Sequence, residues 1–322
     1  MVDAEYVLPL RWADDDGIDA LTEYLRRLRD LVDVTVVDGS PPPQFAAHAA
    51  KWAALVRHVP PDSRPTANGK VAGVLTGVRL ARHEAIVIAD DDVRYDEREL
   101  RRLVALLRSA DLVRPVNVFA PPLPWHARWD TARSLLNRAL GTDYPGTLAV
   151  RRSILERTGG YDGDVLFENL ELIRTVRAAG GRERVVPDLY VRRIPPTAGH
   201  FRGQRVRQAY DDFAQPLRLA VELAILPSAL VALRRPPLLL GGLLATVLLA
   251  EVGRRRHGGA RIYPATSALW APAWVAERAA CIWLALGRRL TGGVPYAGGK
   301  LLRAGTPMRE LRRRFAGRAG AA

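Results

Sequence analysis

The segment Ala85-Ile86-Val87-Ile88-Ala89-Asp90-Asp91-Asp92 decides the fold class of this chain. Its first five residues are an uninterrupted apolar run, which is typical of a strand buried on both faces of a parallel sheet. In open α/β sheets, ligands bind at the carboxyl ends of the strands, where the three aspartates would lie. Carboxylates suit a hard divalent cation that keeps several waters and is completed by substrate phosphates. The segment therefore predicts an α/β protein that acts on a phosphorylated donor.

A second acidic triplet, Asp14-Asp15-Asp16, precedes an amphipathic stretch at residues 17–31. A helix start accounts for this triplet, with Asp16 as the predicted N-cap and its neighbours near the positive end of the helix dipole. The triplet at residues 90–92 is different, because the next predicted helix, residues 97–109, begins too far downstream for Asp90 to cap it. We therefore prefer metal binding for residues 90–92 and helix capping for residues 14–16.

Composition allows several partners for the 322-residue chain, which is long enough for two domains, or for one large domain and an appendage. The net charge of +14 suits nucleic acid, an anionic membrane surface or a phosphorylated substrate. The basic residues are dispersed and no nucleic-acid recognition motif accompanies them, so we do not expect nucleic acid as a partner. The single cysteine, Cys281, excludes an intramolecular disulfide and a zinc site built from cysteines.

Short β-like runs alternate with helical periodicity up to about residue 195. We expect strands at residues 5–10, 32–37, 84–89, 112–116 and 147–150, and helices at residues 17–31, 44–59, 70–81, 97–109 and 167–176. This alternation predicts a mostly parallel sheet covered by helices.

Apolar segments dominate the chain after residue 215, at residues 217–233, 238–252 and 265–286. A 17-residue helix spans about 26 Å, slightly less than the ~30 Å hydrocarbon core of a bilayer. We expect the first two segments to form a helical hairpin in the membrane. Arg234-Arg235 at its turn would then lie outside, against the positive-inside tendency, and a re-entrant or interfacial pair would avoid that conflict. A soluble hydrophobic helical subdomain is the alternative.

The third apolar segment contains Trp270, Trp274 and Trp283, which favour a helix lying at the membrane interface. The chain begins without a basic region followed by an apolar core, so we expect no secretory signal and a catalytic domain on the cytoplasmic side of the cell membrane. The predicted domains are residues 1–200 (catalytic), 201–215 (linker), 216–290 (hydrophobic membrane-associated helices) and 291–322 (basic tail).

Several motifs in this order resemble family 2 glycosyltransferases, which have the GT-A nucleotide-sugar-binding fold, from about Tyr6 to Tyr210. Val36-Val37-Asp38-Gly39-Ser40 is similar to a strand-end element whose aspartate contacts the nucleotide base, and Asn68-Gly69-Lys70 to a Gly-Lys element that approaches the donor. Asp90-Asp91-Asp92 matches the DxD motif. The resemblance implies that Asp38, Gly69, Lys70, Asp90 and Asp91 line the donor site.

The resemblance also implies a Mg²⁺ or Mn²⁺ ion held by Asp90 and Asp92 against the donor diphosphate. Such a cation stabilises the negative charge that the departing nucleoside diphosphate gains. Gln204-Arg205-Val206-Arg207 resembles the start of the QxxRW motif of membrane-bound members, so Gln204, Arg205 and Arg207 are donor-site candidates. The next residue is Gln208 instead of Trp, which departs from the motif.

The catalytic base follows from the Gly159-Gly160-Tyr161-Asp162 element, after which the family carries a Glu-Asp pair. The matching pair here is Glu168-Asn169, and an amide cannot accept a proton usefully near neutral pH. Glu168 is therefore the preferred base, with Glu171 and Asp162 as the other candidates.

These residues predict a membrane-associated, metal-dependent glycosyltransferase that moves a sugar from a nucleotide-sugar donor to an acceptor hydroxyl, with inversion. The expected acceptor is lipid-linked or a cell-envelope glycan. One alternative is a nucleotidyl- or phosphosugar-transferase on a related sheet. The other is a non-catalytic membrane protein that retains the fold, which Asn169 and the incomplete QxxRW element suggest.

Overall fold

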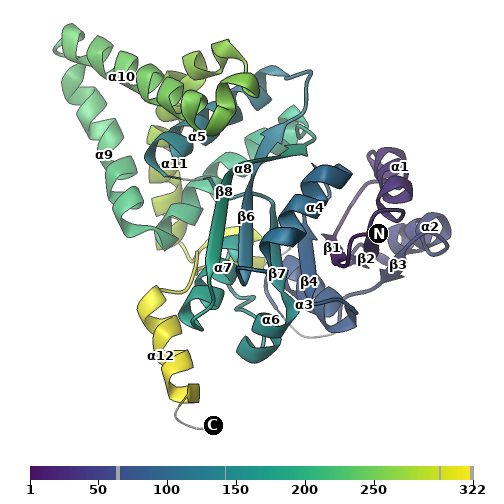
Figure 1. Ribbon diagram of the computed structural model, residues 1–322. Coiled ribbons are helices and arrows are strands. Elements are labelled where there is room, and N and C mark those ends of the chain that lie inside the picture. The colour runs from purple at the N-terminus through teal and green to yellow at the C-terminus, as the bar shows by residue number, and fades with distance from the viewer. Residues whose placement is uncertain (63–65, 142, 297–298, 320–322) are drawn as a thin grey trace. The chain divides into compact units, whose positions relative to one another are not determined.

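The computed structural model describes residues 1–62, 66–141, 143–296 and 299–319 of the chain (Figure 1). The chain divides into two compact units, which we describe separately. Unit 1 comprises residues 1–117, 144–191 and 306–322, and unit 2 comprises residues 118–143 and 192–305. Contacts between residues define these units, whereas composition along the chain defines the predicted domains. The boundaries of the predicted domains stay a prediction.

Unit 1 contains the large sheet and the helices around it. The strands of this sheet are β1 (Glu5–Leu10), β2 (Asp33–Asp38), β3 (Arg57–Val59), β4 (Ala85–Ala89), β5 (Val93–Arg94), β6 (Leu112–Phe119), β7 (Thr147–Arg151) and β8 (Glu183–Arg193). The helices are α1 (Ile18–Leu28), α2 (Pro42–Trp52), α3 (Gly69–Leu80), α4 (Glu97–Leu106), α6 (Arg152–Thr158), α7 (Glu168–Ala178) and α12 (Met308–Ala319).

The strand order of the sheet is β3-β2-β1-β4-β7-β6-β8-β5. The run from β3 to β4 is parallel throughout, and β7 is antiparallel to both of its neighbours, β4 and β6. The predicted class, a mostly parallel sheet flanked by helices, is confirmed. The parallel run matters for function because it brings the carboxyl ends of β2 and β4 to the same edge.

Alternating side chains of the sheet build two separate cores, one on each face. Tyr6 and Leu8 of β1 pack with the apolar faces of α1 and α4. Val7, between them, packs on the opposite face with α3, α6 and α7. This period of two is what a strand buried on both faces requires. The sheet is therefore a middle layer packed on both faces, and the loops at its carboxyl edge present the site.

Helix α3 approaches β1 unusually closely because it carries glycine at its contact positions. A Cβ atom at Gly77 would lie 2.3 Å from Cγ1 of Val7, and one at Gly73 would lie 2.9 Å from Cβ of Pro9. No larger residue fits either position without a shift of the helix or the strand. The close approach fixes the first turn of α3, and with it Lys70, relative to the sheet.

Unit 2 is mostly helical. It contains α5 (Trp125–Leu140), α8 (Ala198–Tyr210), α9 (Pro216–Ala232), α10 (Pro236–Arg255), α11 (Ala271–Leu290), three short 3₁₀ helices (Asp211–Ala214, Arg256–Arg261 and Ala265–Trp270) and the hairpin of β9 (Val294–Tyr296) and β10 (Gly299–Leu301). Arg278, almost fully buried, donates to Asp212 at 3.0 Å, and Arg218 pairs with Asp212 and Glu222 at 2.9 Å. These ion pairs join α9 and α11 inside the unit.

The helices α9 and α10 expose many large apolar side chains. Leu240, Leu244 and Leu248, spaced four residues apart on α10, are 66%, 58% and 56% exposed. Among the described residues, the segment Pro236–Arg261 is long and apolar enough to cross a membrane, judged by length and composition alone. This segment contains residues 238–252, the second of the two apolar segments that we expect to form a hairpin.

Two sequence predictions about local structure need correction. Residues 44–59 do not form one helix, because α2 ends at Trp52 and residues 57–59 form β3 beside β2. Asp16 is not the N-cap of α1, since Gly17 occupies that position without a side-chain cap. The predicted linker at residues 201–215 contains most of α8, which runs to Tyr210, and the 3₁₀ helix that follows, and its role as a linker stays a prediction.

Candidate active site

The candidate active site of unit 1 lies at the carboxyl ends of the parallel strands. Asp38 is the last residue of β2, and Asp90 follows the last residue of β4. Lys70 is in the first turn of α3, where Asn68 caps the helix by accepting from the amide of Lys70 at 3.1 Å. Glu168 is the first residue of α7. The sheet thus gathers side chains that lie far apart in the sequence.

Two loop contacts hold the helix starts together. The amide of Asn68 donates to the carbonyl of Gly163 at 2.8 Å, and its side-chain Nδ2 donates to the carbonyl of Val165 at 3.1 Å. Asn68 is fully buried, so these bonds form away from water. Because residues 163–165 lead directly into α7, the first turns of α3 and α7 are fixed beside each other.

Lys70 is the centre of the site. Its Nζ lies 2.5 Å from Oδ1 of Asp90 and 2.7 Å from Oε1 of Glu168. Burial alone would lower the pKa of Lys70, but the carboxylates of Asp90 and Glu168 outweigh burial and raise this pKa above its usual range. The side chain therefore stays an ammonium ion. It joins two residues that the sequence assigned to different roles, metal ligand and base.

The other two aspartates of the triplet have separate surroundings. Oδ2 of Asp91 accepts from the indole N–H of Trp12, in the loop after β1. The backbone amide of Trp12 also donates to Oγ of Ser40 at 2.9 Å, so this residue links the ends of β1, β2 and β4. Asp92, like Asp90 and Asp91, is half-buried. The carboxylate of Asp90 is 25% exposed and remains accessible from the edge of the sheet.

The oxygen donors at residues 90 and 92 fit a hard divalent cation. Asp90 already holds a cation, the ammonium of Lys70, at 2.5 Å. Within the described residues, the groups of three possible ligands are Asp38 with His48 and His58, and Glu5 with Asp33 and His83, so the triplet at residues 90–92 forms no such group. Mg²⁺ and Mn²⁺ suit a site of one or two carboxylates that substrate phosphates complete.

Asp38 is buried and surrounded by donors that the sequence did not indicate. Its Oδ2 lies 2.6 Å from Nδ1 of His48 and 3.0 Å from Nε2 of His58, and its Oδ1 accepts from the amide of Ser40 at 2.9 Å. Burial raises the pKa of Asp38, but hydrogen bonds from His58, Ser40 and His48 outweigh it and hold this pKa well below its usual range. Nε2 of His48 in turn lies 3.0 Å from Asp15, so Asp15 belongs to this cluster.

The remaining base candidates are already engaged. Glu171 is fully buried, and its Oε2 accepts from the amide of Thr306 at 2.7 Å, where the chain returns to unit 1 before α12. Burial raises the pKa of this carboxyl group. Oδ1 of Asp162 accepts from the amide of Asp164 at 2.8 Å. Asn169 donates from Nδ2 to the carbonyl of Pro145 at 3.1 Å.

The QxxR-like residues lie in unit 2, and we describe them by their partners there. Nη1 of Arg205 lies 3.3 Å from Oδ1 of Asp130 and 3.6 Å from Oε2 of Glu277, and its guanidinium stacks 3.9 Å from the ring centre of Phe201. Arg207 lies over the ring of Tyr296, and the half-buried Gln204 is near His200. Packing inside unit 2 accounts for Arg205, and the predicted donor contacts of all three stay a prediction.

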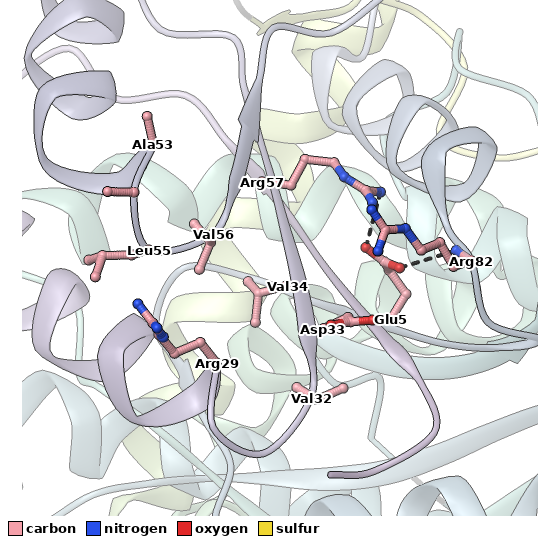
Figure 2. A pocket seen from close by; sticks show the side chains of 11 residues that line it. Glu5, Arg29, Val32, Asp33, Val34, Ala53, Leu55, Val56, Arg57 and Arg82 are labelled. Atoms are coloured by element: carbon pink, nitrogen blue, oxygen red, sulfur yellow. Dashed lines mark hydrogen bonds and ion pairs between the residues drawn. The ribbon is translucent and has the colours of Figure 1, made fainter.

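A cavity of about 320 Å³ lies at the opposite, amino-terminal edge of the parallel strands (Figure 2). Figure 2 shows the carboxylate of Glu5, at the start of β1, pointing toward the guanidinium of Arg57, at the start of β3. The amide of Arg82 also donates to Glu5. This cavity is separated from the candidate active site by the length of the strands.

Comparisons with known proteins agree with this description of the fold. The family model described as "Glycosyl transferase family 2" matches residues 16–159. This part of the chain is therefore a family 2 glycosyltransferase domain, and it carries Asp38, Lys70 and Asp90 of the site. The predicted family is confirmed. A search of curated proteins finds no match to the chain.

The chain also matches solved structures. The chain is similar to the mannosyltransferase PcManGT from Pyrobaculum calidifontis in complex with GDP-Man and Mn²⁺, with 19% identity, 87% of each chain covered and a TM-score of 0.50. It also matches glucosyl-3-phosphoglycerate synthase from Mycobacterium tuberculosis in complex with Mn²⁺, UDP and glucosyl-3-phosphoglycerate, with 18% identity, 62% of this chain and 74% of that chain covered and a TM-score of 0.42. The first likeness supports the GT-A fold.

Proposed function

We propose that this protein transfers a sugar from a nucleotide-sugar donor to an acceptor hydroxyl, with inversion at the sugar carbon, and that it does so at a membrane. The observation that carries the proposal is the joining of Asp90 and Glu168 through Lys70 at the carboxyl edge of a family 2 domain. This edge is where an open α/β sheet binds its ligands. The solved neighbours contain Mn²⁺ with GDP-Man or UDP, which supports a similar donor here.

Each residue has a role that follows from its surroundings. Asp90 and Asp92 would hold a divalent cation, which supplies positive charge for the departing nucleoside diphosphate. Lys70 adds a second positive charge beside the phosphates, at the N-terminus of α3, where helix amides favour anions. Glu168 accepts the proton of the attacking hydroxyl, since Asn169 cannot and Glu171 is fully buried and bonded to Thr306.

Activity is tested by the products. Purified protein is incubated with Mn²⁺, a panel of UDP- and GDP-sugars, and vesicles containing isoprenoid-linked or glycan acceptors. Free nucleoside diphosphate supports glycosyl transfer, whereas pyrophosphate supports the nucleotidyltransferase alternative. Glu168→Gln should lower kcat about 10²–10⁴-fold, as loss of a general base does. The matched control is Glu156→Gln on α6, whose side chain is 60% exposed and pairs with Arg152. Equal rates for the two variants would show that Glu168 is not the catalytic base.

The non-catalytic alternative rests on Asn169 and Gln208, which depart from the family motifs. It is favoured if no donor is consumed but nucleoside diphosphates still raise the melting temperature in the presence of Mn²⁺, because ligands that bind the folded state stabilise it.

The membrane part of the proposal rests on the exposed leucines of α10. Their apolar area would enter a lipid phase, and a catalytic domain on the cytoplasmic side would then meet a lipid-linked acceptor at high local concentration. Replacing Leu240, Leu244 and Leu248 together by Gln should abolish flotation of the protein with vesicles. A variant that floats as well as the wild type would refute this role for α10. Substitutions are preferable to truncation, since residues 306–322 belong to unit 1.

A further inference from the structure

Lys70 already pairs with a carboxylate that a divalent cation would need. The ammonium is within 2.7 Å of two carboxylates, and the three side chains are only 12–25% exposed. Asp90 and Glu168 with Lys70 carry a net charge of −1, so the pair is partly neutralised before any cation arrives. A lysine ammonium donates three hydrogen bonds and has no acceptor, and two of these donors face the carboxylates.

A divalent cation bound to Asp90 would lie close to this ammonium. Such ions contact carboxylate oxygens at about 2.0–2.2 Å, and the ammonium is already 2.5 Å from Oδ1 of the same carboxylate. Two cations a few ångströms apart in a half-buried site repel each other strongly, because screening by water is reduced there. Each cation therefore weakens the binding of the other unless an additional anion separates them.

We propose that Lys70 is the resident counter-cation of Asp90 and Glu168, and that the divalent cation binds tightly only together with a nucleoside diphosphate. The diphosphate gives the ammonium another anionic partner. Lys70 then leaves Asp90 to the cation and leaves the carboxylate of Glu168 able to accept a proton. Binding of cation and donor is thereby coupled, and linkage requires the coupling to be equal in both directions. This inference rests on the proposed function, because it assumes that the donor carries a diphosphate.

The lysine also explains how the protein avoids an unpaired charge before the donor binds. Without Lys70, Asp90 and Glu168 would be two partly buried carboxylates without their cation, which is a costly arrangement. With Lys70, both are paired, and the first turn of α3 holds the ammonium in place through the cap from Asn68. The same side chain can then serve the donor-free and the donor-bound protein.

The test measures Mn²⁺ binding directly, by the electron paramagnetic resonance signal of the free ion. The full-length protein is titrated with Mn²⁺ alone, with Mn²⁺ plus UDP and with Mn²⁺ plus GDP, and the Mn²⁺ that each nucleotide binds in protein-free titrations is subtracted. For the wild type we expect at least tenfold tighter Mn²⁺ binding with one of the nucleotides than without. Lys70→Met should bind Mn²⁺ alone at least fivefold more tightly than the wild type, and the benefit of the nucleotide should shrink. Lys70→Arg, which keeps the charge, should behave like the wild type.

Lys51→Met is the matched control, because Lys51 also pairs with a carboxylate, Asp19 at 2.7 Å, but on the surface of α2. Its Mn²⁺ affinity should equal that of the wild type. The inference is overturned if Lys70→Met binds Mn²⁺ alone no more tightly than the wild type does. If that variant does not fold, the wild type still decides, since equal Mn²⁺ affinity with and without nucleotide would also overturn it. Turnover of a sugar nucleotide alongside either negative result would leave the proposed function standing.

Discussion

Replacing Asn169 by Asp tests whether this position has lost a catalytic carboxylate or serves another purpose. The family pattern implies that an aspartate here would restore the usual base, and kcat would rise. The structure implies the opposite, because Nδ2 of Asn169 donates to the carbonyl of Pro145 at 3.1 Å from a half-buried position. An aspartate has no donor there and would place a negatively charged oxygen against the carbonyl oxygen.

The loss of stability expected for Asn169→Asp follows from the single hydrogen bond between Asn169 and Pro145. Losing the donor removes a hydrogen bond and leaves the carbonyl and the new carboxylate unsatisfied, which amounts to about 1–3 kcal/mol. For a folded unit of about 150–250 residues, each kcal/mol lowers the melting temperature by about 2–4 °C. Because Glu168 is the proposed base, we expect kcat of Asn169→Asp to stay within about threefold of the wild type, well inside the 10²–10⁴-fold range of a general base.

The assay combines calorimetric melting with steady-state release of nucleoside diphosphate. Asn169→Ala is the control, because it removes the same donor without adding a charge and should cost less stability than Asn169→Asp. A tenfold or larger rise in kcat for Asn169→Asp would refute the reasoning and would show that the carboxylate, not the bond to Pro145, is what the position lacks.

Three further outcomes test the fold around the site. Gly77→Ala should lower the free energy of unfolding by about 1–3 kcal/mol, since its Cβ would lie 2.3 Å from Val7; Gly203→Ala in α8, with open space around it, should be neutral or stabilising, and equal effects in urea titrations would contradict the close packing. Asp38 has a depressed pKa in the folded state, so its stabilising effect is present above the unfolded-state value of about 4 and is lost as pH falls below it. The stability difference between wild type and Asp38→Asn should therefore narrow from pH 7 to pH 3, and a constant difference would argue against the cluster. Deleting residues 306–322 should destabilise unit 1 by at least about 1–3 kcal/mol, because buried Glu171 loses the amide of Thr306, and an unchanged melting temperature would contradict this role.

The sheet could be predicted from the sequence where its strands are apolar. The run at residues 85–89 and the strand before Asp38 are buried on both faces, so their composition alone indicates a parallel sheet. Strand β8 escaped prediction because it is rich in charged residues and only part of it is buried. The sequence favours helix at residues 57–59, since three residues are too few to show a period of two and the preceding helical pattern continues into them.

The sequence indicates each of the main candidate site residues, but it does not indicate which of them contact one another. Asp38, Lys70, Asp90 and Glu168 each belong to a recognisable motif, yet their pairing depends on loops that join positions 98 residues apart. His48 and His58 carry no motif, and only the parallel pairing of β2 and β3 brings His58 beside Asp38. Their regular spacing from Asp38, 10 and 20 positions, is a signal that gains meaning only with the fold.

The candidate active site is rich in negative charge, although the chain as a whole is positively charged. The chain carries +14, but in the candidate site Lys70 contacts the carboxylates of Asp90 and Glu168, and Asp38, Asp91 and Asp92 follow or end strands at the same edge of the sheet. A diphosphate approaching that edge alone would meet an excess of negative charge, and Lys70 cannot offset it while it is bound to two carboxylates. A divalent cation that arrives with the diphosphate reduces this repulsion, because it neutralises most or all of the diphosphate charge and can contact the aspartates directly. The excess of carboxylates therefore favours binding of donor and cation as one species. Removal of the Lys70 side chain should make the affinity for the cation less dependent on the donor.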